Sequence, residues 1–220
     1  MLLQTLLVAH IAVLGYWLGS ELVINSTFRY VSYADGLPFA QRDHLLDHLM
    51  DVDQHVRYAL ILQLGLGTAL AALYGYLPGG GALAAAAGLF AAGWLALVEL
   101  THRRRKTSAG TLLALADHAV RHAVMLALLV AGALSLTGLL GAPHWLAWKM
   151  ILYAGVIVCG VGIRLALVRY FAVWQEIGAH GSDQALEDRL RRGYRRATTI
   201  LVVLWVLIAG ITVLSVLQPA

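Results

Sequence analysis

Three histidines and four aspartates gather in one sixteen-residue stretch, DHLLDHLMDVDQHVRY (43–58), directly before a long apolar run. On an α-helix His48, Asp51 and His55 share one face, and leucines occupy the opposite face. Imidazoles and a carboxylate at this spacing are the arrangement in which a helix offers ligands to a metal ion. The same pattern is typical of the solvated face of an amphipathic helix, so both interpretations stay open.

Other ionisable side chains lie within the apolar runs themselves. A charged group is costly in lipid, so an ionisable residue that is present there indicates a function. His10 lies within LLVAHIAVLGYW without a neighbouring charge, which favours a ligand or proton-transfer role. Lys149 needs a counter-ion, an anionic ligand or a depressed pKa at its position in a later run. Glu21 lies on the same helical stripe as His10, and we expect Glu21 or Asp53 to act as a proton relay.

Two short segments resemble each other, DQHVR (53–57) and DHAVR (117–121), and each places an arginine four residues after an aspartate. The spacing predicts a structural ion pair between Asp117 and Arg121 within one helix. The second segment also presents two imidazoles, on His118 and His122. Together with other groups at this depth they predict a polar cluster at one end of the bundle, composed of Glu21, Asp53, His55, Arg57, Glu99, His102, Asp117, His118, Arg121 and His122.

The composition identifies the elements that must position these groups. Only 13% of the 220 residues are charged and 60% are hydrophobic, whereas soluble domains have about 25% charged residues. We therefore predict an all-α, polytopic transmembrane helical bundle formed as a single integral membrane domain over 1–220. An amphipathic helix over 38–54 should lie at the cytoplasmic interface and then turn into the second span. The predicted spans are near 3–25, 55–77, 80–100, 112–140, 144–168 and 197–217.

The distribution of basic residues predicts the orientation. The loops near 101–107 and 189–196 are strongly basic and should stay in the cytoplasm, which puts both termini outside, in a bacterial inner membrane. His10 and Lys149 then lie at similar depth near the outer surface. The N-terminal run lacks a basic flank and a cleavage site, so we expect a retained span. Tryptophans near the span ends are expected to be interfacial anchors, namely Trp17, Trp145 and Trp148.

Two of these segments resemble a known family. HIAVLGYWLG (10–19) is similar to the first span of HemJ-type protoporphyrinogen oxidases and of the related CopD-type copper resistance membrane proteins, and HWLAWKMILY (144–153) resembles a later span of the HemJ group. The ending TILVVLWVLIAGITVLSVLQP (199–219) looks like the last span of that group. The resemblance implies haem b binding and porphyrinogen oxidation, with His10 and Lys149 as the important positions. This chain departs from the family around Cys159, where HemJ proteins carry Tyr-His.

Three functions are compatible with the sequence. A haem b-binding membrane redox protein, an oxidase of a hydrophobic or porphyrinogen-type substrate, would hold iron by imidazoles, and Arg57, Arg121 or Lys149 would pair with the propionates. Its partners would be the bilayer and a membrane redox protein or quinone. A transition-metal binding or transport protein would instead use His10, His48, Asp51, His55, His118 and His122, or a di-metal set of Glu21, Glu99, His102 and Asp117. A structural or assembly protein would need neither.

Overall fold

The computed structural model describes residues 1–105 and 107–219, and Lys106 of the predicted basic loop lies outside the described residues. Six helices follow one another with short connections, and the described residues contain no strand. All six are long and apolar enough to cross a membrane, which confirms the predicted all-α bundle and makes the chain an integral membrane protein. The helices are α1 (Leu2–Tyr33), α2 (Phe39–Leu73), α3 (Gly80–Arg103), α4 (Ser108–Leu136), α5 (His144–His180) and α6 (Gln184–Leu217).

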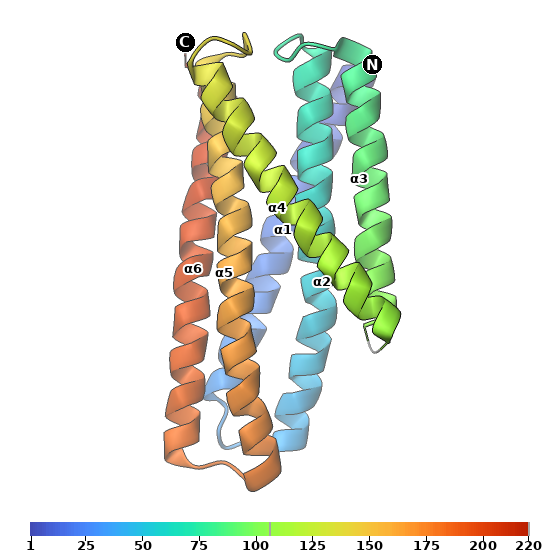
Figure 1. Ribbon diagram of the computed structural model, residues 1–220. Helices are drawn as coiled ribbons and strands as arrows, with labels where there is room; N and C mark the ends of the chain where they lie inside the picture. The colour runs from blue at the N-terminus through green and yellow to red at the C-terminus, as the bar shows by residue number, and fades with distance from the viewer. Residues whose placement is uncertain (106, 220) are drawn as a thin grey trace.

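The helices alternate in direction, so both termini lie at the same end of the molecule (Figure 1). Each helix packs against its neighbours in the chain, and α6 returns to contact α1. In Figure 1 α4 runs obliquely across the front of the bundle, whereas α5 and α6 lie side by side. The bundle is therefore a closed ring of six helices.

Small residues set the close approaches between helices. A Cβ atom added to Gly65 of α2 would lie 2.7 Å from the Cβ of Ala91 in α3, and one added to Gly110 would lie 1.9 Å from the carbonyl oxygen of Arg104. The first contact holds α2 against the alanine-rich face of α3, as small residues do in membranes. The second lets the first turn of α4 lie against the Arg104 carbonyl after α3, and the Thr107 side chain caps α4 by accepting a hydrogen bond from the Gly110 N–H.

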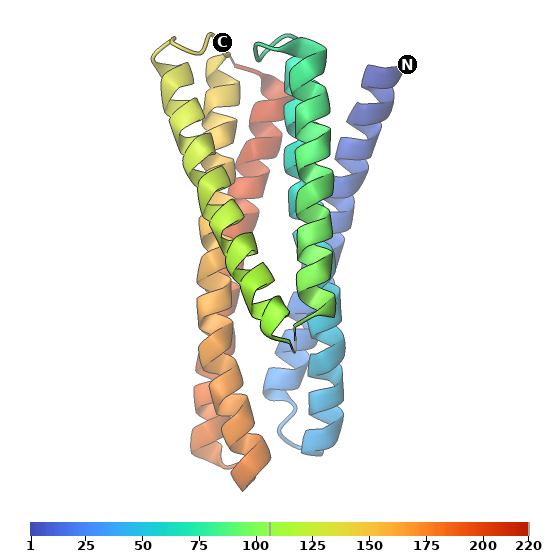
Figure 2. The ribbon, with the colours of Figure 1, turned by 45° about the vertical axis from the view of Figure 1, so that its right-hand side comes forward.

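Four helices continue well beyond the hydrophobic spans. At about 1.5 Å per residue the 37 residues of α5 extend about 56 Å, compared with about 30 Å for a hydrocarbon core. In Figures 1 and 2 the end of α3 and the start of α4 lie well short of the far ends of the other helices. We call the protruding part of α1, α2, α5 and α6, residues 26–54 and 169–196, the extension.

The extension has its own core. Aromatic and aliphatic side chains from all four helices form it, including Phe28, Leu46, Trp174 and Leu190. At its far end Arg42 is 1% exposed and makes a bidentate ion pair with Glu187, with N–O distances of 2.7 and 3.0 Å. These contacts join α2 to α6 across the extension.

The amphipathic helix predicted for 38–54 forms, but its predicted turn into the second span is wrong. Residues 39–73 are one continuous helix of 35 residues. The junction contains neither glycine nor proline, and the apolar face, with Leu46 and Leu49 buried, packs inside the extension. This face therefore has protein partners and does not lie flat on a membrane surface.

Candidate functional site

Four cationic side chains fall within the spans predicted from the sequence, and two of them carry their own counter-ion. Arg57 bonds Asp53 at 2.9 Å on α2, and Arg121 bonds Asp117 at 3.0 Å on α4, as the four-residue spacing predicted. Asp117 is buried and also accepts a hydrogen bond from the Trp94 indole at 2.8 Å. The two similar segments DQHVR and DHAVR thus form the same kind of intrahelical ion pair.

The other two cations are Lys149 and Arg164. Neither makes a hydrogen bond or an ion pair with a described side chain. Both belong to α5. Each of them lines a cavity, and the two cavities are different. Because an unpaired cation within a membrane span is costly, these two positions mark the candidate sites.

The first site, the His10 cavity, has a volume of about 510 Å³ and lies toward the termini. His10 of α1 and Lys149 of α5 both line it. The structure therefore brings together the two residues that the sequence analysis had placed at the same depth in the membrane. Gln63 of α2 donates a hydrogen bond to the His10 carbonyl oxygen at 3.0 Å. The rest of the lining is largely apolar and aromatic, with Leu14, Trp17, Leu64, Tyr74, Tyr76, Trp145, Met150 and Tyr153 among its members.

The His10 ring is held without a polar partner. Its Nδ1 atom is buried and makes no hydrogen bond with the described residues, and the same is true of the Gln63 side-chain oxygen. A Cβ atom added to Gly67 would lie 3.3 Å from the His10 Cε1 atom. The absence of a side chain at Gly67 therefore leaves room for an imidazole whose hydrogen-bonding capacity is unused.

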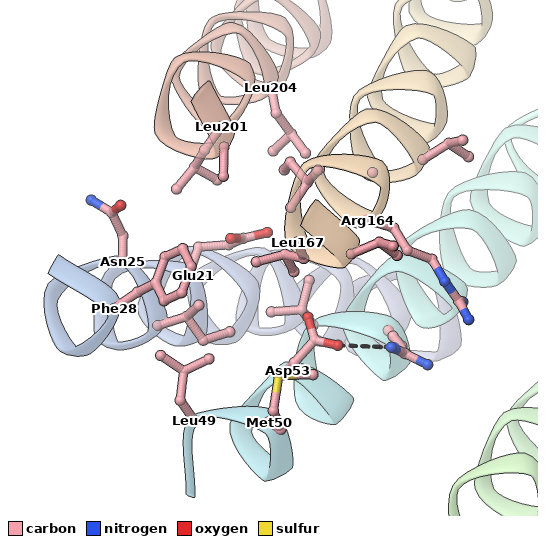
Figure 3. Close-up of a pocket in the computed structure, with 18 of the residues that line it drawn as sticks. Glu21, Asn25, Phe28, Leu49, Met50, Asp53, Arg164, Leu167, Leu201 and Leu204 are labelled. Carbon is pink, nitrogen blue, oxygen red and sulfur yellow. Dashed lines mark hydrogen bonds and ion pairs between the residues drawn. The ribbon is translucent and has the colours of Figure 1, made fainter. Parts of the chain in front are cut away.

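The second site, the Arg164 cavity, has a volume of about 610 Å³ and lies between the spans and the extension. Five helices line it, and its polar side chains include Glu21, Asp53, Arg57, His118, Arg121 and Arg164. Figure 3 shows the carboxyl groups of Glu21 and Asp53 within this space, while Arg164 extends to the side away from Glu21. Five of the ten residues of the predicted polar cluster thus do share one cavity.

A layer of packed side chains separates the two cavities. Trp17 is 2% exposed, lies edge to face with Tyr153, and donates a hydrogen bond at 3.3 Å to Glu21. Tyr153 donates a hydrogen bond at 2.6 Å to the carbonyl oxygen of Leu60. Trp17 and Tyr153 line the His10 cavity, whereas Glu21 and Leu60 line the Arg164 cavity. The two sites are therefore distinct, and the Trp17–Glu21 hydrogen bond connects them.

The remaining predicted ligands lie outside both cavities. His55 is exposed and bonds Tyr16 of α1, and His122 is exposed with its Nδ1 atom 2.7 Å from the carbonyl oxygen of His118. His48 is exposed, and Asp51 lies 3.9 Å from both His102 and Arg105. The imidazoles of His55, His118 and His122 are thus not arranged around one centre.

The di-metal set is also dispersed. Glu99 bonds Tyr58 and Arg103, Asp117 is occupied by Trp94 and Arg121, and Glu21 lines the Arg164 cavity. Among residues 1–105 and 107–219, no three His, Cys, Asp or Glu side chains lie close enough to hold a metal ion.

Some functional positions were not visible in the sequence. Trp17 and Trp145 were expected to be interfacial anchors, but both are buried, and only Trp148 is exposed. Gln63 gave no signal, because an amide in an apolar run has no characteristic spacing. Arg164 was recognisable from its place on one stripe with Lys149 and Tyr153, although its lack of a counter-ion required the neighbouring helices to be known.

No protein family, curated protein or solved structure matches this chain. The fold and the sites define its class: an integral membrane protein with a six-helix bundle, in which two of the cavities are each lined by a cation that has no ion-pair partner among residues 1–105 and 107–219.

Proposed function

We propose that the protein binds haem b in the His10 cavity and is a membrane redox protein that oxidises a hydrophobic or porphyrinogen-type substrate. The observation that carries the proposal is the pairing of an unbonded imidazole with an unpaired ammonium group in one largely apolar cavity. Its volume of about 510 Å³ falls within the range of about 300–1,000 Å³ that small-molecule and cofactor sites occupy.

The residues present fit this cofactor. Histidine is the usual axial ligand of haem iron, and methionine is a known second ligand. His10 and Met150 both line the cavity and would hold the haem iron, since the His10 side chain makes no hydrogen bond with the described residues. Lys149 would pair with a propionate, which would supply the counter-ion that the ammonium group lacks.

The surrounding side chains would exclude water and position the substrate. Trp145, Tyr76 and Tyr153 give the cavity flat apolar surfaces suited to a planar ring system. When bound, the haem would supply one-electron chemistry. Glu21 is in place to accept or hold a proton behind Trp17, on the Arg164 side of the layer. The similarity of 10–19 and 144–153 to HemJ-type spans supports the same residues.

The orientation belongs to the same proposal. We place the extension in the cytoplasm and both termini outside, because the basic residues of 189–196 and 103–105 lie at the extension end of the bundle. A bacterial inner membrane is the compartment expected for this arrangement, and a quinone or a membrane redox protein would be the electron partner.

Difference spectra test the proposal. Protein purified from cells supplied with 5-aminolaevulinate should show a Soret band and a dithionite-reduced α-band. His10→Ala should abolish both, and Lys149→Gln should lower haem occupancy. His122→Ala is the matched control, because His122 is exposed and lines neither cavity.

Two results would contradict this proposal. A wild-type protein without porphyrin absorption would exclude haem binding. Loss of the α-band in His118→Ala but not in His10→Ala would move the haem to the Arg164 cavity.

A further inference from the structure

Arg164 is an exposed cation that lines this cavity and makes no ion pair with the described residues, whereas the other two arginines of the cavity pair within their own helices. Arg57 and Arg121 line the same cavity, but each is bonded to an aspartate four residues earlier. Glu21 is 6% exposed and bonds the Trp17 indole, and no bond joins it to Arg164 among the described residues. The cavity therefore keeps one guanidinium that the protein itself does not neutralise.

Basic side chains from three helices line this cavity. Arg164 comes from α5, Arg121 and His118 from α4, and Arg57 from α2. The carboxyl group of Glu21 comes from α1, on the side from which Arg164 extends away in Figure 3. An anion beside Arg164 would lie near Arg57 and Arg121, each with its bonded aspartate, so Arg164 is the arginine left to pair with it. The anion would also avoid the one unpaired carboxyl group.

The remainder of the cavity is largely apolar, with Asn25, Gln175 and Thr198 as its other polar side chains. Phe28, Leu49, Met50, Leu167, Leu201 and Leu204 surround the space beside Glu21 and Asp53 (Figure 3). This lining cannot bind a fully hydrated ion, but it can hold a hydrocarbon body. The cavity also lies where the spans meet the extension, which is the depth at which lipid headgroups meet acyl chains.

We infer that the Arg164 cavity binds an amphiphile with an oxyanion headgroup, a phosphate or a carboxylate. The headgroup pairs with the guanidinium of Arg164, whose planar donors match such groups in a bidentate manner. The apolar body lies against Leu167, Leu201 and Leu204. This site is separate from the His10 cavity and does not depend on haem binding.

Calorimetric titration tests the inference with dodecyl phosphate as the amphiphile and inorganic phosphate as the free ion. The protein is kept in dodecyl maltoside, and thermal unfolding without ligand confirms that each variant is folded. Arg164→Gln removes the charge, and Arg164→Lys keeps it without the planar donors. Arg169→Gln is the matched control, since Arg169 is an exposed arginine of the same helix that does not line the cavity.

We expect Arg164→Gln to raise the Kd for dodecyl phosphate about tenfold or more, which corresponds to one lost charged hydrogen bond or ion pair. Arg164→Lys should have an intermediate effect, and Arg169→Gln should stay within about twofold. Equal effects of the Arg164 and Arg169 variants, or no binding to the wild type, would overturn the inference. Inorganic phosphate binding as tightly as dodecyl phosphate would refute the amphiphile and leave a free-ion site. The haem spectrum should be unchanged in Arg164→Gln, so the two proposals fail independently.

Discussion

The buried ion pair at the far end of the extension gives the sharpest test of the packing described above. Removing the Glu187 carboxylate strips Arg42 of its bonds at 2.7 and 3.0 Å and leaves only the bond at 3.1 Å to the Val31 carbonyl oxygen. Ser182 loses its acceptor as well. Because Arg42 stays buried beneath its neighbours, its charge would keep only the Val31 carbonyl and the Trp174 ring, 5.1 Å away, and no bonded carboxylate. Such a loss costs about 3–5 kcal/mol, a large part of a typical unfolding free energy of about 5–15 kcal/mol.

A double-mutant cycle measures this coupling. The variants are Arg42→Met, Glu187→Leu and the double variant, and hydrogen exchange of extension amides reports the free energy of opening. Each single change should destabilise the extension by about 3–5 kcal/mol, whereas the double variant should lose far less than the sum, because it buries no lone charge.

The matched control is the exposed pair of Arg189 and Glu176. Its N–O distance is 3.0 Å, but its side chains are 49% and 43% exposed. Arg189→Met should cost about 0–1 kcal/mol. Additive effects in the Arg42–Glu187 cycle, or equal costs for the buried and the exposed pair, would refute the argument from burial.

Three further predictions follow from features of the fold. Burial raises the pKa of Glu187, but the hydrogen bonds from Arg42 and Ser182 lower it by more, so the pKa lies below its ordinary value of 4.5. The stabilisation by the Glu187 carboxylate is therefore complete at neutral pH and should be lost as the pH falls below about 4.5 and through the pKa of the folded state. Hydrogen exchange should detect this acid dependence in the wild type but not in the Arg42→Met/Glu187→Leu variant. Gly65→Ala should destabilise the bundle by about 1–3 kcal/mol, as overpacking does, and thermal unfolding should show partial recovery when Ala91→Gly is added, whereas Gly88→Ala has open space and should not destabilise. A reporter fused after Gln218 should be active outside the cytoplasm and one inserted at Gly181 inside it, and the opposite pattern would invert the proposed orientation.

Much of the membrane fold could be predicted because lipid imposes a strong constraint on each helix separately. Runs such as 80–98 are apolar throughout, and the Asp117–Arg121 pair is set by helical spacing alone. His10 and Lys149 could be paired because span order and depth place them at the same level. These inferences need no knowledge of which helices touch.

The remaining features depend on neighbours that are distant in the sequence. Trp17 has the position of an interfacial tryptophan, but Tyr153 and the core cover it. His55 has the spacing of a ligand, yet it bonds Tyr16 on the outer side of α1 and α2. The polar parts of α5 and α6 gave no membrane signal, so their continuation as one core with α1 and α2 was not predicted.

The intrahelical ion pairs bear on how the chain enters the membrane during synthesis. Arg57 and Arg121 carry partners only four residues away, so α2 and α4 can leave the translocation machinery already neutralised at these positions. Arg42 pairs with Glu187, which is synthesised 145 residues later. Because Arg42 belongs to the extension and not to a predicted span, its charge is not inserted into lipid before that partner is made. Lys149 and Arg164 are the exceptions, since α5 must insert with two uncompensated charges. The helix that supplies both cavities with a cation is therefore the one that carries no partner for its charges along its own length.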